Sequence, residues 1–267
     1  MSASRDLSRE QAALARWDPR PRWYHPLLGR LVIMTSRLIM TRLNRLEIEG
    51  RETFEAVRER GGRGLLTYSN HVSLFDDPML IANIASGPYS KVRWVGADAI
   101  NFFGNGFKAW LFTAGRSVPV MRGAGLDQPG MYFLGERLAA GEWVHLLPEG
   151  GRTRDPEARM APEFKAGIGM LIARAKPLAL PFCHYGMHEV LPVGTVRPRS
   201  GHTVRMVFGE VIDCTDAWIA DAAARRECAE TEGPELWRAI AAETYDALAK
   251  IERAVHPAFA APEDAGA

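Results

Sequence analysis

The sequence of 267 residues has few cysteines, almost no net charge and no long uninterrupted apolar run. Its three cysteines, Cys183, Cys214 and Cys228, are widely spaced, which argues against a disulfide framework or a cysteine-based zinc site and favours a reducing compartment. A formal net charge of +1 gives no general attraction to nucleic acid, so no nucleic-acid partner is expected. The N-terminal segment 1–16 is polar with charges of both signs, which does not match a secretory signal.

The apolar residues that are present alternate between two patterns along the chain. Short apolar runs at 64–68, 91–97, 142–147 and 177–184 are typical of buried strands, and helical patterns at 79–85, 128–140 and 163–175 lie between them. This order predicts one α/β domain with a mixed, largely parallel sheet flanked by helices.

Further segments complete the prediction. Residues 115–122 favour an edge strand because they contain Pro119, and 203–208 favour a late strand. Residues 46–63 are charged and turn-like, and a last helix is expected over 234–255. We therefore expect an N-terminal arm and helix over 1–45, a single domain over 46–258 and a flexible tail over 259–267.

The segment 69–78, Ser-Asn-His-Val-Ser-Leu-Phe-Asp-Asp-Pro, lies between a predicted strand and a predicted helix. His71 and Asp76 are five residues apart, so a chain turn between them would place the carboxylate beside the imidazole. An Asp that orients a His is the usual arrangement of a general base. A second interpretation is a capping box, in which Ser73 caps the helix and Asp76 reaches back to a backbone N–H. The two are compatible if Asp77 serves the helix dipole.

A second polar cluster follows the predicted strand 142–147. The sequence Glu149-Gly150-Gly151-Arg152-x-Arg154 combines glycines, which let backbone N–H groups approach a ligand, with arginines that suit a phosphate. Arg116 and Arg122 flank another strand and can converge on the same anion, although a turn with solvated arginines is also open. His184 and His188 lack acidic or cysteine companions, so no metal site is expected.

The apolar segment 27–43 is interrupted by Arg30, Arg37 and Arg42 and is therefore a poor membrane-spanning helix. As an amphipathic helix with Trp23 nearby, it can lie in a membrane interface with its arginines directed to phosphates, or it can pack on the domain core. The aromatic segment 102–112 has the same two interpretations, core or second membrane contact.

Together these motifs resemble the phospholipid/glycerol acyltransferases, the PlsC-like family, and most closely its tafazzin branch. The resemblance covers about residues 64–212. It is carried by Asn70-His71-x-x-x-x-Asp76, Gly115-Arg116-x-Val118-Pro119-Val120-x-Arg122-Gly123, Trp143-Val144-His145-x-x-Pro148-Glu149-Gly150 and His184-x-Gly186-Met187. The continuation Gly151-Arg152-Thr153-Arg154 is nearer to the Gly-Thr-Arg-Ser form of the wider family than to the tafazzin form.

The resemblance implies that His71 is the general base for acyl transfer to a lysophospholipid hydroxyl and that Asp76 orients it. It also implies a substrate-binding set for the phosphate and head group: Arg116, Arg122, Glu149, Gly150 and Arg152. The expected co-substrate is an acyl-CoA or acyl carrier protein thioester, with no bound cofactor and no metal. Two alternatives are a tafazzin-like transacylase that uses no CoA and a non-catalytic lipid-binding protein. The expected location is peripheral, at the cytoplasmic face of a membrane, and the oligomeric state is left open.

Overall fold

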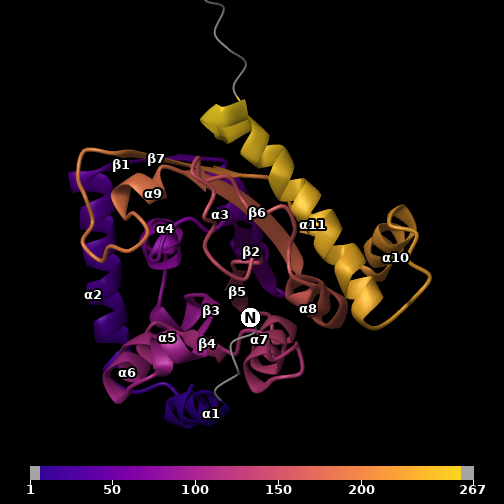
Figure 1. Ribbon diagram of the computed structural model, residues 1–267, viewed down its shortest axis with the longest axis horizontal. Helices are drawn as coiled ribbons and strands as arrows, with labels where there is room; N and C mark the ends of the chain where they lie inside the picture. Colours follow the sequence, from indigo (N-terminus) through magenta and orange to yellow (C-terminus); the bar gives the residue numbers. More distant parts are fainter. Residues whose placement is uncertain (1–6, 260–267) are drawn as a thin grey trace, which may run out of the picture.

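The computed structural model describes residues 7–259, and in this part of the chain it contains one eight-stranded sheet (Figure 1). The strand order is β1-β7-β6-β2-β5-β3-β4, and the short β8 pairs with β6. Neighbours from β6 to β4 are parallel, as are β1 and β7, whereas β6 pairs antiparallel with β7 and with β8. The strands are β1 (Arg45–Glu49), β2 (Leu65–Ser69), β3 (Trp94–Asp98), β4 (Ser117–Val120), β5 (Trp143–Leu146), β6 (Leu178–Tyr185), β7 (Thr203–Phe208) and β8 (Ile212–Asp213).

Helices cover both faces of the sheet. One face carries α7 (Pro129–Ala139), α8 (Gly167–Ala175), α10 (Asp216–Arg225) and α11 (Pro234–Val255). The other carries α3 (Arg51–Arg60), α4 (Asp76–Ile84) and α9 (Met187–Val190), with α2 (His25–Leu38) packed outside α4. The remaining segments are α1 (Leu7–Arg16), α5 (Ala99–Phe103), α6 (Gly106–Ala114), the π-helical turn η1 (Ile39–Leu43), and the short η2 (Tyr89–Lys91) and η3 (Pro257–Phe259).

The alternation of side chains along the central strands explains the two cores. In β2, Leu66 and Tyr68 belong to the core under α8 and α11, whereas Leu65 belongs to the core under α3 and α4. In β6, Cys183 likewise belongs to the first of these cores and Phe182 to the second. A strand covered on both faces is apolar along its whole length, which is why these strands appear in the sequence as continuous runs rather than alternating ones.

The predicted α/β class and largely parallel sheet are confirmed, and β4 is an edge strand as its proline indicates. The turn-like interpretation of 46–63 is wrong, because this segment forms most of β1 and all of α3. Its charged residues are exposed or half-buried, while Phe54 and Val57, three apart on one helix face, are buried. The helix expected from 163 begins only at Gly167. The expected boundary at 45/46 falls inside β1, and residues 260–267 of the expected tail lie outside the described residues.

The N-terminal helix α2 packs against α4 and also presents an apolar stripe outward. Arg37 donates from Nε to the Ala82 carbonyl and from Nη2 to the Ala85 carbonyl, so it binds the end of α4 rather than pointing to lipid phosphates as the sequence suggested. The exposed side of α2 carries apolar residues at helical spacing: Leu27, Leu31, Met34 and Leu38. Among the described residues, no helix has the length and apolar character needed to cross a bilayer.

Candidate active site

The candidate site lies at the carboxyl edge of the parallel strands, where open α/β sheets commonly bind ligands. His71 follows β2, Arg122 follows β4, and the segment Glu149–Arg152 follows β5. Because these strands are parallel and belong to the run β2-β5-β3-β4 of the sheet, their carboxyl ends bring together residues that are up to 81 positions apart in the sequence.

His71 and Asp76 form the pair that their spacing predicts. The Nδ1 of His71 lies 2.9 Å from Asp76 Oδ2, and the same oxygen accepts the backbone N–H groups of Val72 at 2.7 Å and Ser73 at 2.8 Å. Burial alone raises the pKa of Asp76, but His184, His71 and the Ser73 N–H together hold this pKa below its ordinary value. A carboxylate beside Nδ1 selects the tautomer in which Nδ1 carries the proton and Nε2 is the acceptor.

The capping alternative is realised only in part. Asp76 does accept the Ser73 N–H, but the Ser73 hydroxyl donates to the Leu191 carbonyl, 3.0 Å away, and therefore does not cap α4. Asp77, at the start of α4, forms a buried ion pair with Arg93. The first turn of α4 is thus occupied by two carboxylates with separate partners, of which Asp76 serves His71.

The loop that carries His71 is attached to β6 through Asn70 and His184. The Asn70 side chain accepts the His184 N–H at 3.0 Å and donates to the His184 carbonyl at 2.8 Å, and His184 Nε2 lies 3.1 Å from the Asn70 carbonyl. His184 Nε2 is also 3.7 Å from Asp76 Oδ2. Burial lowers the pKa of His184, which keeps this imidazole neutral. Two histidines therefore flank one carboxylate, and only His71 has access to solvent.

The backbone of His71 is held from the opposite side by the segment after β5. Its N–H donates to Glu149 Oε1 at 2.6 Å, and its carbonyl accepts the Thr153 N–H at 2.8 Å. The second oxygen of Glu149 accepts the Ala161 N–H at 2.7 Å. Burial raises the pKa of Glu149 to about 7, against the lowering effect of these two N–H donors. Glu149 therefore holds the candidate base in place through its backbone.

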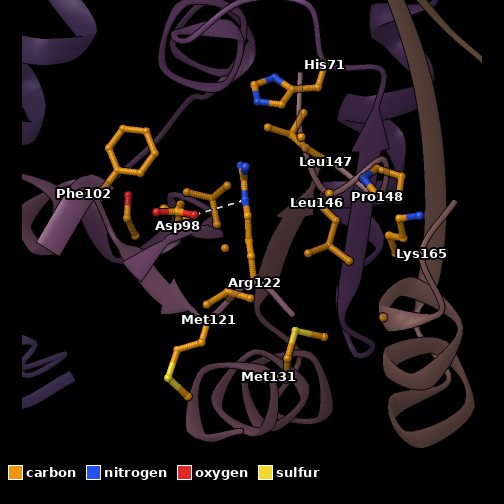
Figure 2. Close-up of a pocket in the computed structure, with 18 of the residues that line it drawn as sticks. His71, Asp98, Phe102, Met121, Arg122, Met131, Leu146, Leu147, Pro148 and Lys165 are labelled. Carbon is orange, nitrogen blue, oxygen red and sulfur yellow. Dashed lines mark ion pairs between the residues drawn. The ribbon is translucent and has the colours of Figure 1, made fainter. Parts of the chain in front are cut away.

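A cavity of about 580 Å³ opens beside His71, within the size range of small-molecule sites (Figure 2). Arg122 extends toward His71 and pairs with Asp98, its Nε lying 3.1 Å from the carboxylate, while Met121 and Met131 lie at the opposite end of the view from His71. The lining is mostly apolar and includes Val95, Phe102, Phe112, Val120, Leu146 and Ile168. The cavity thus combines an apolar interior with a candidate base and two cations, Arg122 and Lys165.

A second, more open cavity of about 480 Å³ adjoins the first, since Gly150 and Gly151 line both cavities. Arg152 and Arg154 line this second cavity, as does Glu149. Neither arginine has a hydrogen bond or ion pair with any residue in the range 7–259. Gly150, which lines both cavities, has φ of +72°, a conformation that favours glycine.

Arg116 is not part of this site, which corrects the expectation from the sequence. It precedes β4 and so lies at the amino edge of the sheet, whereas Arg122 follows the same strand. Its buried guanidinium donates to the carbonyls of Tyr89 and Ser90 and to Glu142, and it stacks 4.1 Å from the Trp94 ring. Arg116 is therefore a structural residue, and we remove it from the candidate phosphate ligands.

Sequence reasoning missed several supporting residues. Asn70 was visible in the motif, but its pairing with His184 depends on the contact between β2 and β6. Thr153 and Asp98 act through a backbone N–H and an ion pair that no local pattern indicates. Within residues 7–259, no group of three or more His, Cys, Asp or Glu side chains is arranged to bind a metal.

Comparison with known proteins agrees with this geometry. A family model described as Acyltransferase matches residues 45–185. The chain is similar to tafazzin from Drosophila melanogaster, with 31% identity over 74% of this chain and 54% of the relative. It is similar to tafazzin from Dictyostelium discoideum (34% identity, 57% of this chain, 56% of the relative) and to N-acylphosphatidylethanolamine synthase from Arabidopsis thaliana (33%, 57% and 57%). The chain spans little more than half the length of these relatives.

The fold also resembles a solved structure. The 1-acyl-sn-glycerophosphate (LPA) acyltransferase PlsC from Thermotoga maritima superposes with a TM-score of 0.57 at 17% identity, covering 86% of this chain and 80% of that chain. This likeness concerns the fold alone. With the family model matching more than half of the sequence, the chain belongs to the acyltransferase family, and its resemblance to the tafazzin branch is confirmed.

Proposed function

We propose that the protein transfers a fatty acyl group to the hydroxyl of a lysophospholipid, an acceptor of the 1-acylglycerol-3-phosphate type. The observation that carries this proposal is the His71–Asp76 pair beside a largely apolar cavity that also contains a cation. A cavity of this composition fits an amphiphile with an anionic head group and a hydrocarbon chain. Membership of the acyltransferase family supports the reaction type.

The mechanism follows from the protonation states of the pair. Nε2 of His71 takes the proton of the lysophospholipid hydroxyl while the hydroxyl oxygen attacks the acyl carbonyl carbon. Asp76, hydrogen-bonded to Nδ1, stabilises the imidazolium that forms. The tetrahedral intermediate then expels the thiolate of an acyl-CoA or acyl carrier protein, and the proton passes from Nε2 to this leaving group. No covalent intermediate with the protein is needed.

We assign the phosphate and the head group to the cations that line the two cavities. Arg122 faces the first cavity close to His71, and Arg152 faces the second. Gly150 offers a turn against which a ligand can lie closely, and Glu149 contributes by holding both the His71 loop and the wall of the second cavity. A guanidinium suits phosphate oxygens because it donates through a planar fork.

The main alternative is a CoA-independent transacylase that moves acyl chains between phospholipids. The similarity to two tafazzins over more than half of the chain favours this alternative specifically. The same base serves here, since the leaving group becomes the alkoxide of a lysophospholipid, which takes the proton from His71. A non-catalytic lipid-binding protein is the remaining possibility and predicts binding without turnover.

The test uses purified protein, a panel of lysophospholipids and either acyl-CoA or intact phospholipid as donor, with products identified by mass spectrometry. We expect product with at least one donor, and the donor that is required separates the acyltransferase from the transacylase. His71→Ala should lower the rate by about 10²- to 10⁴-fold, the usual contribution of a general base. His202→Ala, a partly exposed histidine that pairs with Glu189, is the matched control and should retain activity. Turnover that survives in His71→Ala contradicts the general-base assignment.

We further propose a peripheral location at the cytoplasmic face of a membrane. The outward stripe of α2, with Trp23 at its start and Phe107 and Trp110 of α6 nearby, supports this location. Aromatic and aliphatic side chains together suit the boundary between head groups and acyl chains. A lipid substrate requires such contact, because its acyl chains remain in the bilayer until they enter the cavity.

A further inference from the structure

The C-terminal helix α11 is tied to the segment 155–161 near its last turn. The buried Glu252 accepts the Met160 N–H at its Oε1, 2.6 Å away. One turn later, His256 Nε2 lies 2.7 Å from the Glu157 carbonyl and donates to it. Both contacts join residues more than 90 positions apart, and both reach the backbone of the same loop.

This loop is in turn the second partner of Glu149. Ala161, the residue after Met160, donates its N–H to Glu149 Oε2, while Glu149 Oε1 accepts the His71 N–H. A displacement of residues 160 and 161 therefore removes one of the two donors that fix the Glu149 carboxylate. A carboxylate anchored at one oxygen only is free to rotate, and rotation withdraws the acceptor from His71.

The loop does not have a relaxed backbone of its own. Ala158 is buried and has φ of +61°, a left-handed conformation that an L-residue adopts at a cost of order 1–3 kcal/mol. Such a conformation persists only where surrounding contacts determine it, and Glu252 and His256 provide two of them on either side of Ala158. The ties from α11 thus hold a segment that would otherwise relax.

We propose that Glu252 is a positioning residue for the acyl-transfer site: it fixes the 155–161 segment, and through Glu149 it fixes His71. The inference rests on the proposed function, because its kinetic consequence concerns the candidate base. Glu252 itself lines neither cavity, and it reaches the second one only through the backbone N–H of Met160. Its effect is expected in the rate of the chemical step rather than in the binding of the lipid.

The test is a graded series at position 252. Glu252→Ala removes the acceptor, Glu252→Asp withdraws it by one methylene, and Glu252→Gln keeps an acceptor oxygen at the same reach. We expect kcat to fall by about 10- to 100-fold in the Ala variant, the usual effect of a misplaced catalytic group, and less in the Asp variant, with KM little changed. The Gln variant should rescue kcat. Glu243→Ala on the same helix, which loses its ion pairs with Arg225 and Arg226, is the matched control and should keep kcat.

Amide hydrogen exchange at His71, Met160 and Ala161 provides a readout that needs no turnover. Exchange should accelerate in the Ala and Asp variants and remain slow in the Gln variant and the Glu243→Ala control. Unchanged kcat and exchange in the Ala and Asp variants, or equal losses in Ala, Asp and Gln, would overturn the proposal. If Glu252→Ala does not fold, kcat and exchange are compared between the Asp and Gln variants instead. If the wild-type protein transfers no acyl group, the proposed function fails, and the exchange rates alone decide whether Glu252 fixes the loop.

Discussion

Asp76 accepts three hydrogen bonds on a single buried oxygen, whereas Arg152 and Arg154 have no hydrogen-bond or ion-pair partner among residues 7–259. Asp76 begins helix α4, which follows β2, and the two arginines lie on the loop after β5, the strand next to β2. The part of the site that holds the candidate base is therefore built from fixed contacts, and the part proposed to face the ligand is built from cations that remain available.

This difference follows from what each part has to do. A base accelerates proton transfer only if its geometry and tautomer are set before the substrate arrives, so fixed hydrogen bonds around His71 favour the transition state. A phosphate-binding cation must exchange water for ligand, and an internal salt bridge would compete with that exchange. Arg122 is intermediate, because it is exposed and, among residues 7–259, pairs only with Asp98.

The first prediction tests this difference with the two arginines that flank β4. Arg116→Ala removes a buried guanidinium and leaves Glu142 without this partner, so we expect a loss of about 3 kcal/mol in the free energy of unfolding. Arg122→Ala removes an exposed cation at the cavity, so we expect little loss of stability and an increase in KM for the phosphate-bearing acceptor of about 10- to 100-fold. Urea denaturation and steady-state kinetics measure the two effects.

Each arginine serves as the control for the other. Arg122→Lys should recover part of the affinity, since a point charge remains but the planar fork is lost. An Arg116→Ala protein that stays folded but has a raised KM would return Arg116 to the binding site and contradict its assignment as a structural residue.

A second prediction compares the two carboxyl groups that hold His71. The folded-state pKa of Glu149 is raised from 4.5 to about 7, mainly by burial, so between these values the folded protein binds more protons than the unfolded chain. Its contribution to stability therefore decreases as pH rises through this window, by about 3 kcal/mol at most. The contribution of Asp76 to stability depends on pH in the opposite direction. Because its pKa is lowered in the folded protein, Asp76 adds stability above its unfolded pKa, and this stability is lost only at more acidic pH.

The measurement is the free energy of unfolding from pH 5 to pH 8.5 for the wild type and Glu149→Gln. Because glutamine does not titrate, the wild type should lose stability relative to the variant as pH rises. Below pH 5 the wild type should instead lose stability as the pH falls and Asp76 becomes protonated. Parallel curves for the wild type and Glu149→Gln would show that Glu149 does not titrate in this window.

Much of this arrangement was predictable from the sequence, and the contacts that were not predicted have a physical reason. The buried strands were visible as apolar runs because both faces of the sheet are covered. His71 and Asp76 were predictable because their contact spans a single turn. The structure places Arg116 apart from the other candidate residues, and a signal for this existed: in a parallel sheet the residues that follow strands meet at one edge, and Arg116 precedes its strand. Charge also concealed β1 and α3, whose buried residues are few.

Other contacts could not be predicted from any local pattern. Glu252 lies on a helix whose neighbours show only ordinary amphipathic spacing, and its partner is a backbone N–H 92 residues away. The pairing of Asn70 with His184 likewise depends on the register of β2 and β6. A long-range contact to a backbone group leaves no signature in the side chains of the segment whose backbone is contacted. Only the folded chain therefore shows such contacts.

The smallest expected effect concerns the exposed apolar stripe of α2, where the comparison extends to the molecular surface. Met34 is 69% exposed within the apolar stripe, while its neighbour Thr35 is exposed on the same helix. If the stripe lies in the membrane interface, Met34→Ser should weaken binding to vesicles by about 1–2 kcal/mol, roughly 5- to 30-fold in partition. Thr35→Ser changes the same helix by one methyl group and should leave binding nearly unchanged. Sedimentation with vesicles measures both variants, and equal binding by Met34→Ser and the wild type would remove α2 from the proposed membrane contact.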